Sequence, residues 1–228
     1  MEDRRKEEIR TFIFRQINSL YGLNESDIHF ISKYFGQSVE RTLYCFSQNK
    51  NRNFKDNDID LFHTGQMMIF LYYLSNTIFR EETKEGKSIG AEARRACGKV
   101  YCLNKLISQC DIYYEFTMPD YFIVYHPLGS VISRSKIGNG FMLMQGSTVG
   151  ENNGIHPQLG KNVLMFSNAK ILGNCHVGNN VLISANSYIK DMDIPDYSIV
   201  YGQYPNVKVV NNRSRVEEKI SEFFEIDS

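Results

Sequence analysis

The sequence predicts an α+β protein: an N-terminal α-helical domain, then a parallel β-helix, then a short C-terminal helix. Through the C-terminal half a hydrophobic residue returns at every sixth position, in two runs separated by a short break. Strands alternate with period two and α-helices turn every 3.6 residues, so a six-residue repeat is typical of short strands forming the successive sides of a β-helix. The ten ladder positions are Val131, Ile137, Leu143, Val149, Leu159, Met165, Ile171, Val177, Ile183 and Ile189.

The first 110 residues have apolar side chains at helical spacing instead. One set lies between Ile9 and Leu20, and a second runs from Met67 to Ile78. Residues 24–27 offer N-cap candidates for a helix that continues toward Gln48, and another helix is expected to end near Gln109. These patterns predict a helical domain over residues 1–110.

Two further segments complete the expected organisation. The polar stretch from Asn51 to Asp58 predicts a connection between helices. Glycine follows several ladder residues, as in Ile137-Gly138, which suits corners that need close backbone approach or an unusual φ. We therefore expect the β-helix over residues 111–205, with an ordinary antiparallel β-domain as the alternative. Residues 206–228 should form a tail whose amphipathic stretch, Val216 to Phe224, docks as a helix.

The composition restricts the possible partners. Lys plus Arg equals Asp plus Glu, 26 residues each, so no overall basic field favours nucleic acid or an anionic membrane. The five cysteines show no metal-binding spacing, and we expect them to be reduced thiols of a cytoplasmic protein. The most apolar stretch, Met67 to Leu74, is far shorter than the roughly 20 residues that cross a bilayer, so no transmembrane segment is expected.

Several short motifs in the β-helix half are specific enough to suggest a family. They are Val124-Tyr125-His126-Pro127-Leu128-Gly129, Gln145-Gly146-Ser147-Thr148-Val149-Gly150, His156-Pro157, Ala169-Lys170-Ile171-Leu172-Gly173-Asn174 and Tyr201-Gly202-Gln203-Tyr204-Pro205. With these motifs, the chain from about Asp111 to Val210 resembles the serine acetyltransferases. The resemblance implies a left-handed β-helix with hexapeptide repeats and an acetyl-CoA-dependent O-acetyltransferase activity.

The resemblance also implies three catalytic residues. His126 matches the base that deprotonates the acceptor hydroxyl, Asp111 the carboxylate that supports this base, and His156 the second histidine, on a protruding loop. The chemistry agrees, because acyl transfer to a hydroxyl needs a base that titrates near neutral pH. A carboxylate bonded to the other imidazole nitrogen would fix the tautomer of His126. His63, in the helical half, is expected to be a helix-surface residue.

For the coenzyme, the resemblance places acetyl-CoA, as a co-substrate, along a groove of the β-helix. Gly150, Ser167 and Ala185 would contact its pantetheine arm through their backbone, and Lys208 would lie near its phosphates. No metal is expected. The resemblance further implies a homotrimer with the active site in the groove between neighbours, and leaves a dimer of trimers open.

Two departures from the family bear on the acceptor. Serine acetyltransferases have Asp before the catalytic histidine and Arg before the second, whereas this chain has Tyr125 and Ile155. A zwitterionic serine would lose those partners, so we expect a sugar hydroxyl as the acceptor, with Tyr125 and Gln145 contacting it. The chain also resembles, in this region, the serine-acetyltransferase-like enzymes of capsule or lipopolysaccharide decoration, which implies that the sugar belongs to a capsular or surface polysaccharide.

Two alternatives to a glycan acceptor remain open. One is serine O-acetylation in cysteine biosynthesis. The other is a non-enzymatic or metal-binding β-helix, such as the γ-type carbonic anhydrases. The wide spacing of His126, His156 and His176 disfavours a three-histidine zinc site.

Overall fold

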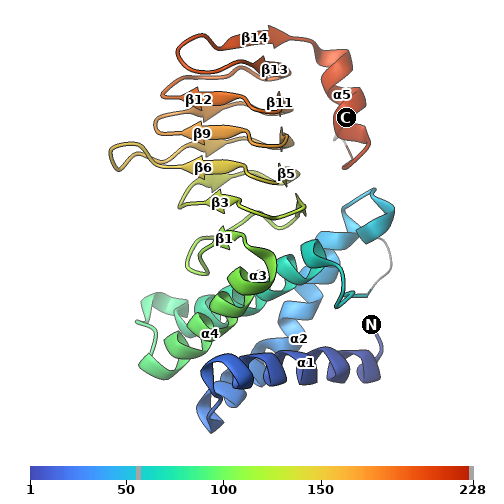
Figure 1. Ribbon diagram of the computed structural model, residues 1–228, viewed down its shortest axis with the longest axis vertical. Helices are drawn as coiled ribbons and strands as arrows, with labels where there is room; N and C mark the ends of the chain where they lie inside the picture. Colours follow the sequence, from blue (N-terminus) through green and yellow to red (C-terminus); the bar gives the residue numbers. More distant parts are fainter. Residues whose placement is uncertain (55–57, 226–228) are drawn as a thin grey trace.

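The computed structural model describes residues 1–54 and 58–225. A bundle of helices lies below a β-helix, and the last helix returns along the side of the β-helix (Figure 1). The N-terminal helices are α1 (Asp3–Tyr21), α2 (Glu25–Ser47), η1 (Arg52–Phe54), α3 (Thr64–Glu82), η2 (Lys84–Gly86) and α4 (Ala91–Ser108). The expected helices are therefore confirmed. The connection expected over 51–58 contains the short turn η1, and its residues 55–57 lie outside the described residues.

Helix α3 is the centre of the helical domain. Every residue from Gly65 to Ile78 is buried, on all sides of the helix. A helix that is apolar all round must be covered all round. Helices α2 and α4 pack against it, and its N-terminal end meets the first coil of the β-helix.

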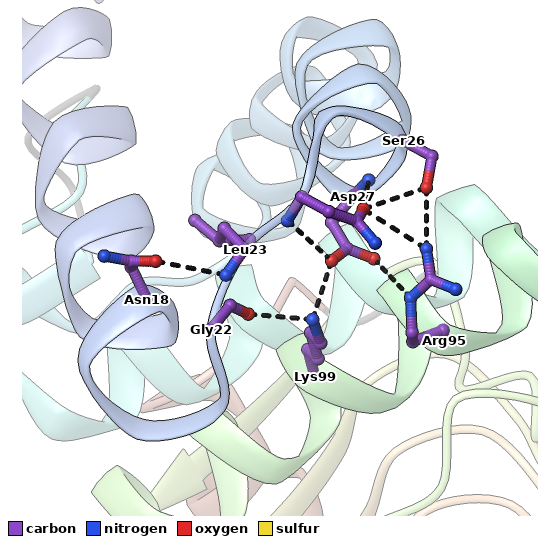
Figure 2. Close-up of polar contacts among 8 residues, drawn as sticks. Asn18, Gly22, Leu23, Ser26, Asp27, Arg95 and Lys99 are labelled. Atoms are coloured by element: carbon purple, nitrogen blue, oxygen red, sulfur yellow. Dashed lines mark hydrogen bonds and ion pairs between the residues drawn. The ribbon is translucent and has the colours of Figure 1, made fainter.

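A buried carboxylate joins the turn between α1 and α2 to α4 (Figure 2). Asp27 is fully buried, and its Oδ1 accepts a hydrogen bond from Arg95 Nε at 3.0 Å, while its Oδ2 accepts from Lys99 Nζ at 2.6 Å. Lys99 Nζ also donates to the carbonyl of Gly22 at 2.7 Å. Burial alone would raise the pKa of Asp27, but hydrogen bonds from Lys99, the Asn24 backbone and Arg95 outweigh it and hold this pKa below its ordinary value.

The β-helix stacks short strands into three parallel sheets. One sheet has the order β1-β3-β6-β9-β12, a second β10-β7-β4, and a third β14-β13-β11-β8-β5-β2, in which only β14 is antiparallel. The strands are β1 (Asp111–Ile112), β2 (Phe122–Tyr125), β3 (Val131–Ile132), β4 (Lys136–Ile137), β5 (Phe141–Met144), β6 (Thr148–Gly150), β7 (Gln158–Leu159), β8 (Val163–Met165), β9 (Lys170–Leu172), β10 (His176–Val177), β11 (Val181–Ile183), β12 (Tyr188–Lys190), β13 (Ser198–Tyr201) and β14 (Lys208–Asn211).

The hydrophobic ladder supplies most of the β-helix core. From Leu143 onward every ladder residue is buried, as the six-residue period predicts. The prediction is wrong for Val131, which is 42% exposed, because Ile132 is the residue that points inward there. Ile132 continues the inward position of Ile112 below it and Val149 above it. The first coil is therefore out of step with the ladder by one residue.

The C-terminal helix docks where its pattern predicts. Helix α5 (Arg213–Ser221) lies beside the six-stranded sheet, with Val216 and Ile220 fully buried (Figure 1). Beyond it, Phe224 forms an antiparallel bridge with Asn49, at the end of α2. The tail thus connects the top of the β-helix to the helical domain. Within the described ranges, the helices are too short or too polar to cross a bilayer.

Coil stacking leaves no room for a side chain at Gly138. A Cβ there would lie 2.7 Å from the backbone carbon and oxygen of Gly160, one coil above. We expect Gly138→Ala to lower the free energy of unfolding by about 2 kcal/mol, since the backbone of two coils would have to separate. Gly98→Ala is the matched control: its Cβ meets open space within α4, so it should stabilise by about 1 kcal/mol. Urea unfolding measures both, and equal effects would contradict this account of the corner.

The Asp27 cluster predicts a pH-dependent stability. Because the folded-state pKa of Asp27 is lowered, its stabilisation is present above the unfolded pKa of about 3.9 and is lost as the pH falls through the folded value. Asp27→Asn should cost about 3 kcal/mol at neutral pH, and this difference from wild type should shrink below about pH 4. Urea unfolding between neutral and acidic pH tests it, and a difference independent of pH would show that the charge of Asp27 is unimportant.

Candidate active site

His126 lies on an enlarged corner of the first coil. Tyr125 pairs with Met144 and Val131 with Thr148, so five residues turn this corner where three suffice in the next coil. The extra residues carry His126 outward, with an exposed side chain and a φ of +47°, in the left-handed region that non-glycine residues rarely adopt. The same conformation turns other corners of this β-helix, for example at Asn168 and Asn186. Among the described residues, none forms a hydrogen bond or ion pair with the His126 imidazole, so it is free to act on a ligand.

A pocket of about 350 Å³ opens beside His126. Its walls come from the end of β2, the corner that follows, the N-terminus of α3 and the loop before it. A Cβ on Gly65 would lie 2.7 Å from the carbonyl oxygen of Val124, so this glycine allows α3 to approach β2 closely. The lining residues are Asn53, Phe62, His63, Thr64, Gly65, Val124, Tyr125, His126, Pro127 and Leu128.

His63 lines this pocket, contrary to the expectation of a helix-surface residue. It is the N-cap of α3, and its Nδ1 accepts a hydrogen bond from the backbone N–H of Gln66 at 3.1 Å. In the neutral imidazole the proton must then be on Nε2, which leaves a donor for a ligand. Sequence reasoning missed this residue because no period links α3 to β2. The signal that was available is the cap itself, His63-Thr64-Gly65 before an apolar run.

The side chains that the structure describes in this pocket are mostly neutral. Its described lining residues include no carboxylate, lysine or arginine. Burial raises the pKa of the Tyr125 phenol, so this group stays protonated, and its oxygen accepts a hydrogen bond from Asn51 Nδ2. The side chains therefore suit hydroxyl and carbonyl groups better than a pair of opposite charges.

His156 lies in a second pocket, on the far side of the five-stranded sheet from the His126 corner. Its loop, residues 151–157, protrudes from the β-helix (Figure 1). This pocket holds about 380 Å³ and is lined by Tyr101, Asp111, Tyr113, Phe116, Val131, Ile132, Ser133, Arg134 and His156. His156 Nδ1 lies 3.4 Å from Ser133 Oγ, and Arg134 is held by Glu115 at 3.1 Å.

Asp111 is placed with His156 rather than with His126. Its Oδ1 accepts a hydrogen bond from the Tyr101 hydroxyl at 2.6 Å, and its Oδ2 accepts from Lys105 Nζ at 2.7 Å. That bond to Asp111 raises the pKa of the Lys105 ammonium. Within the part of the chain that the structure describes, the expected bond from Asp111 to His126 is not formed. Within one chain, His126 thus belongs to one pocket, and Asp111 and His156 belong to the other.

The residues expected to contact the coenzyme do not all lie together. Ser167 and Ala185 occupy equivalent corner positions of consecutive coils, since both flanking sheets pair residues 18 apart, as in Val163 with Val181 and Lys170 with Tyr188. Gln145 precedes them on the same corner, and its backbone carbonyl accepts from Asn168 N at 2.9 Å. This column continues upward from His126.

Gly150 lies away from that corner, whereas Lys208 lies near its upper end, because Ile183 pairs with Val200 and the next residue, Tyr201, pairs with Lys208. Gly150 ends β6 at the opposite edge of the sheet, where a Cβ would meet Leu172 at 2.8 Å. Lys208 is exposed on β14 and pairs with Tyr201. The side chains of the described ranges form no cluster of three or more His, Cys, Asp or Glu that could hold a metal ion.

Comparison with known proteins identifies this architecture. A scan against protein-family models finds no match. The chain is 33% identical over 135 residues to the serine acetyltransferase of Bacillus subtilis (strain 168), an alignment that covers 54% of this chain and 61% of that protein. It is 35% identical over 116 residues to the serine acetyltransferase of Staphylococcus xylosus, covering 46% of this chain. The chain spans only 53% of the length of this second relative.

Among solved structures, the serine acetyltransferase of Vibrio cholerae O1 superposes with a TM-score of 0.68 at 17% identity, covering 91% of this chain and 80% of that one. The fold is that of the serine acetyltransferases. A serine acetyltransferase in complex with CoA superposes with a TM-score of 0.62 at 19% identity, over 81% of this chain and 74% of that one. These relatives do not support the expected closeness to capsule or lipopolysaccharide enzymes, because their names specify serine.

Proposed function

We propose that this protein transfers acetyl from acetyl-CoA to a hydroxyl of a small acceptor bound beside His126. The observation that carries the proposal is the enlarged corner, which projects an imidazole with no partner among the described residues to the mouth of a pocket and begins the corner column of Gln145, Ser167 and Ala185. The curated relatives are named serine acetyltransferases, and one structure of this fold is a complex with CoA. Both support the donor and the reaction class.

The chemistry assigned to His126 is general-base catalysis. The imidazole takes the proton of the acceptor hydroxyl while its oxygen attacks the thioester carbonyl of acetyl-CoA. A tetrahedral intermediate forms, the carbon–sulfur bond breaks, and the imidazolium returns the proton to the departing thiolate. The products are the acetyl ester and CoA. His63, with its donor on Nε2, is placed to hold a second oxygen of the acceptor.

The separation of the two pockets supports an active site shared between copies. One chain presents His126 on one edge of the five-stranded sheet and His156, with Asp111, at the other. In a cyclic trimer each interface joins two different surfaces of neighbouring chains. We therefore propose a homotrimer in which His126 of one copy meets the His156 pocket of the next. Acetyl-CoA would lie along the column of Gln145, Ser167 and Ala185.

The acceptor has two candidates, each favoured by a different observation. The names of the relatives favour L-serine. The lining of the His126 pocket favours a neutral hydroxyl, such as that of a sugar, since no lining side chain of the described residues can pair with an ammonium or carboxylate. The neighbouring copy could supply a charged partner for serine through its Arg134, which lies beside His156.

Replacing the base gives the first test of the reaction. We expect His126→Asn to lower kcat at least about a hundredfold, because a positioned general base contributes roughly 10² to 10⁴. CoA binding, measured by calorimetry, should persist, since the coenzyme corner is unchanged. His176→Asn is the matched control. His176 lies on β10, in the three-stranded sheet, and pairs with Asp193, so its replacement should leave kcat unchanged. Near-normal turnover of the His126 variant would remove it from the mechanism.

The two acceptors differ in one measurable property, their charge. The neutral lining predicts that N-acetyl-L-serinamide, which keeps the hydroxyl without ionic groups, reacts with a kcat/KM at least equal to that of L-serine. Release of the CoA thiol measures both, alongside a panel of neutral sugars. If serine were preferred by about a hundredfold or more, its charges would be recognised, and serine would be the physiological acceptor.

A further inference from the structure

We propose that the C-terminal strap, residues 222–225, is a positioning element for the acceptor pocket. The inference rests on the proposed function of that pocket and adds a residue, Phe223, that touches neither acceptor nor coenzyme. The strap follows α5 and returns from the β-helix to the helical domain, beside the end of α2. It contacts the pocket wall through Phe223, whose ring packs against Tyr125.

The strap is held in place by backbone and side-chain contacts. The backbone N–H of Lys50 donates to the carbonyl of Phe223 at 2.9 Å, and Phe224 bridges to Asn49. Lys50 Nζ pairs with Glu225 at 2.9 Å. Phe223 is 8% exposed and Phe224 is fully buried. A segment fixed in this way transmits its position to whatever packs against it.

A row of aromatic rings runs from the strap to the pocket. The ring of Phe223 lies edge-on to Tyr125 with centroids 5.9 Å apart, and Tyr125 lies edge-on to Phe54 at 6.3 Å. Phe54 in turn lies edge-on to His63 at 5.3 Å. The row therefore begins on the strap and ends at two residues that line the pocket, Tyr125 and His63.

The row matters because it holds the side chain of Tyr125, which forms part of the pocket wall. Tyr125 is the residue before His126 at the enlarged corner, and apart from the rings its phenol is held by Asn51. Edge-to-face pairs each contribute about 0.5 to 1.5 kcal/mol. Removing the Phe223 ring leaves a void behind Tyr125, and a displaced wall reduces acceptor binding more than coenzyme binding. The coenzyme column lies on another part of the corner.

Steady-state kinetics of Phe223→Ala tests the inference. We expect the KM of the best acceptor to rise about tenfold, while the KM of acetyl-CoA stays within about twofold of wild type. Phe223→Leu, which refills part of the void, should recover most of the acceptor affinity. Val216→Ala is the matched control, because it removes buried bulk from α5, the helix that precedes the strap. Unfolding midpoints place the three variants on one stability scale.

The outcomes distinguish a failure of the strap's role from a failure of the proposed function. An unchanged acceptor KM in Phe223→Ala, or an equal rise in Val216→Ala, would show that the strap only stabilises the fold and would overturn the inference alone. A wild-type protein that releases no CoA with any hydroxyl acceptor would overturn the proposed function, and the strap's role with it.

Discussion

The stacking of one coil on the next is the constraint on which the rest of this structure depends. Each coil donates its backbone hydrogen bonds to the coil beside it, and corner side chains repeat the pattern, as Asn162 Nδ2 does with Asn180 Oδ1 at 2.9 Å. Buried corners require these partners, because an unpaired polar group away from water is costly. The register places the core residues at the inward-facing positions of each coil. Where two backbones approach most closely, as at Gly138 and Gly160, only glycine fits.

The same register determines where chemistry can occur. An extra residue cannot enter a coil without leaving the stack, so it must appear at a corner or in a loop. Two such departures carry a histidine: the enlarged corner carries His126, and the protruding loop carries His156. The two histidines lie at opposite edges of the five-stranded sheet, so they belong to two different faces of the β-helix. A neighbouring copy is the natural means of bringing such faces together.

Much of this could be predicted from sequence because a period encodes it. The ladder predicts the core from Leu143 onward, and the helical spacing predicts α5, with Val216 and Ile220 buried. Val131 escaped the pattern because the inward positions Ile132 and Ile137 are five residues apart instead of six, so the first coil is one residue out of step. His63 was missed, and Asp111 found other partners, because both depend on how the helical domain packs against β1 and β2. Gly65 packs against Val124 in that contact, and Asp111 accepts hydrogen bonds from Tyr101 and Lys105. No spacing in the sequence reveals these pairs.

The central claim is that His126 and His156 act together across neighbouring copies, and complementation tests it most directly. Two inactive variants, His126→Asn and His156→Asn, would be co-expressed with different tags, and the mixed oligomers isolated by both tags. Each mixed trimer contains a groove with both histidines intact, so activity should return to at least about a quarter of wild type. Mixed oligomers as inactive as the parents would contradict the claim, as would a His156→Asn parent with wild-type activity.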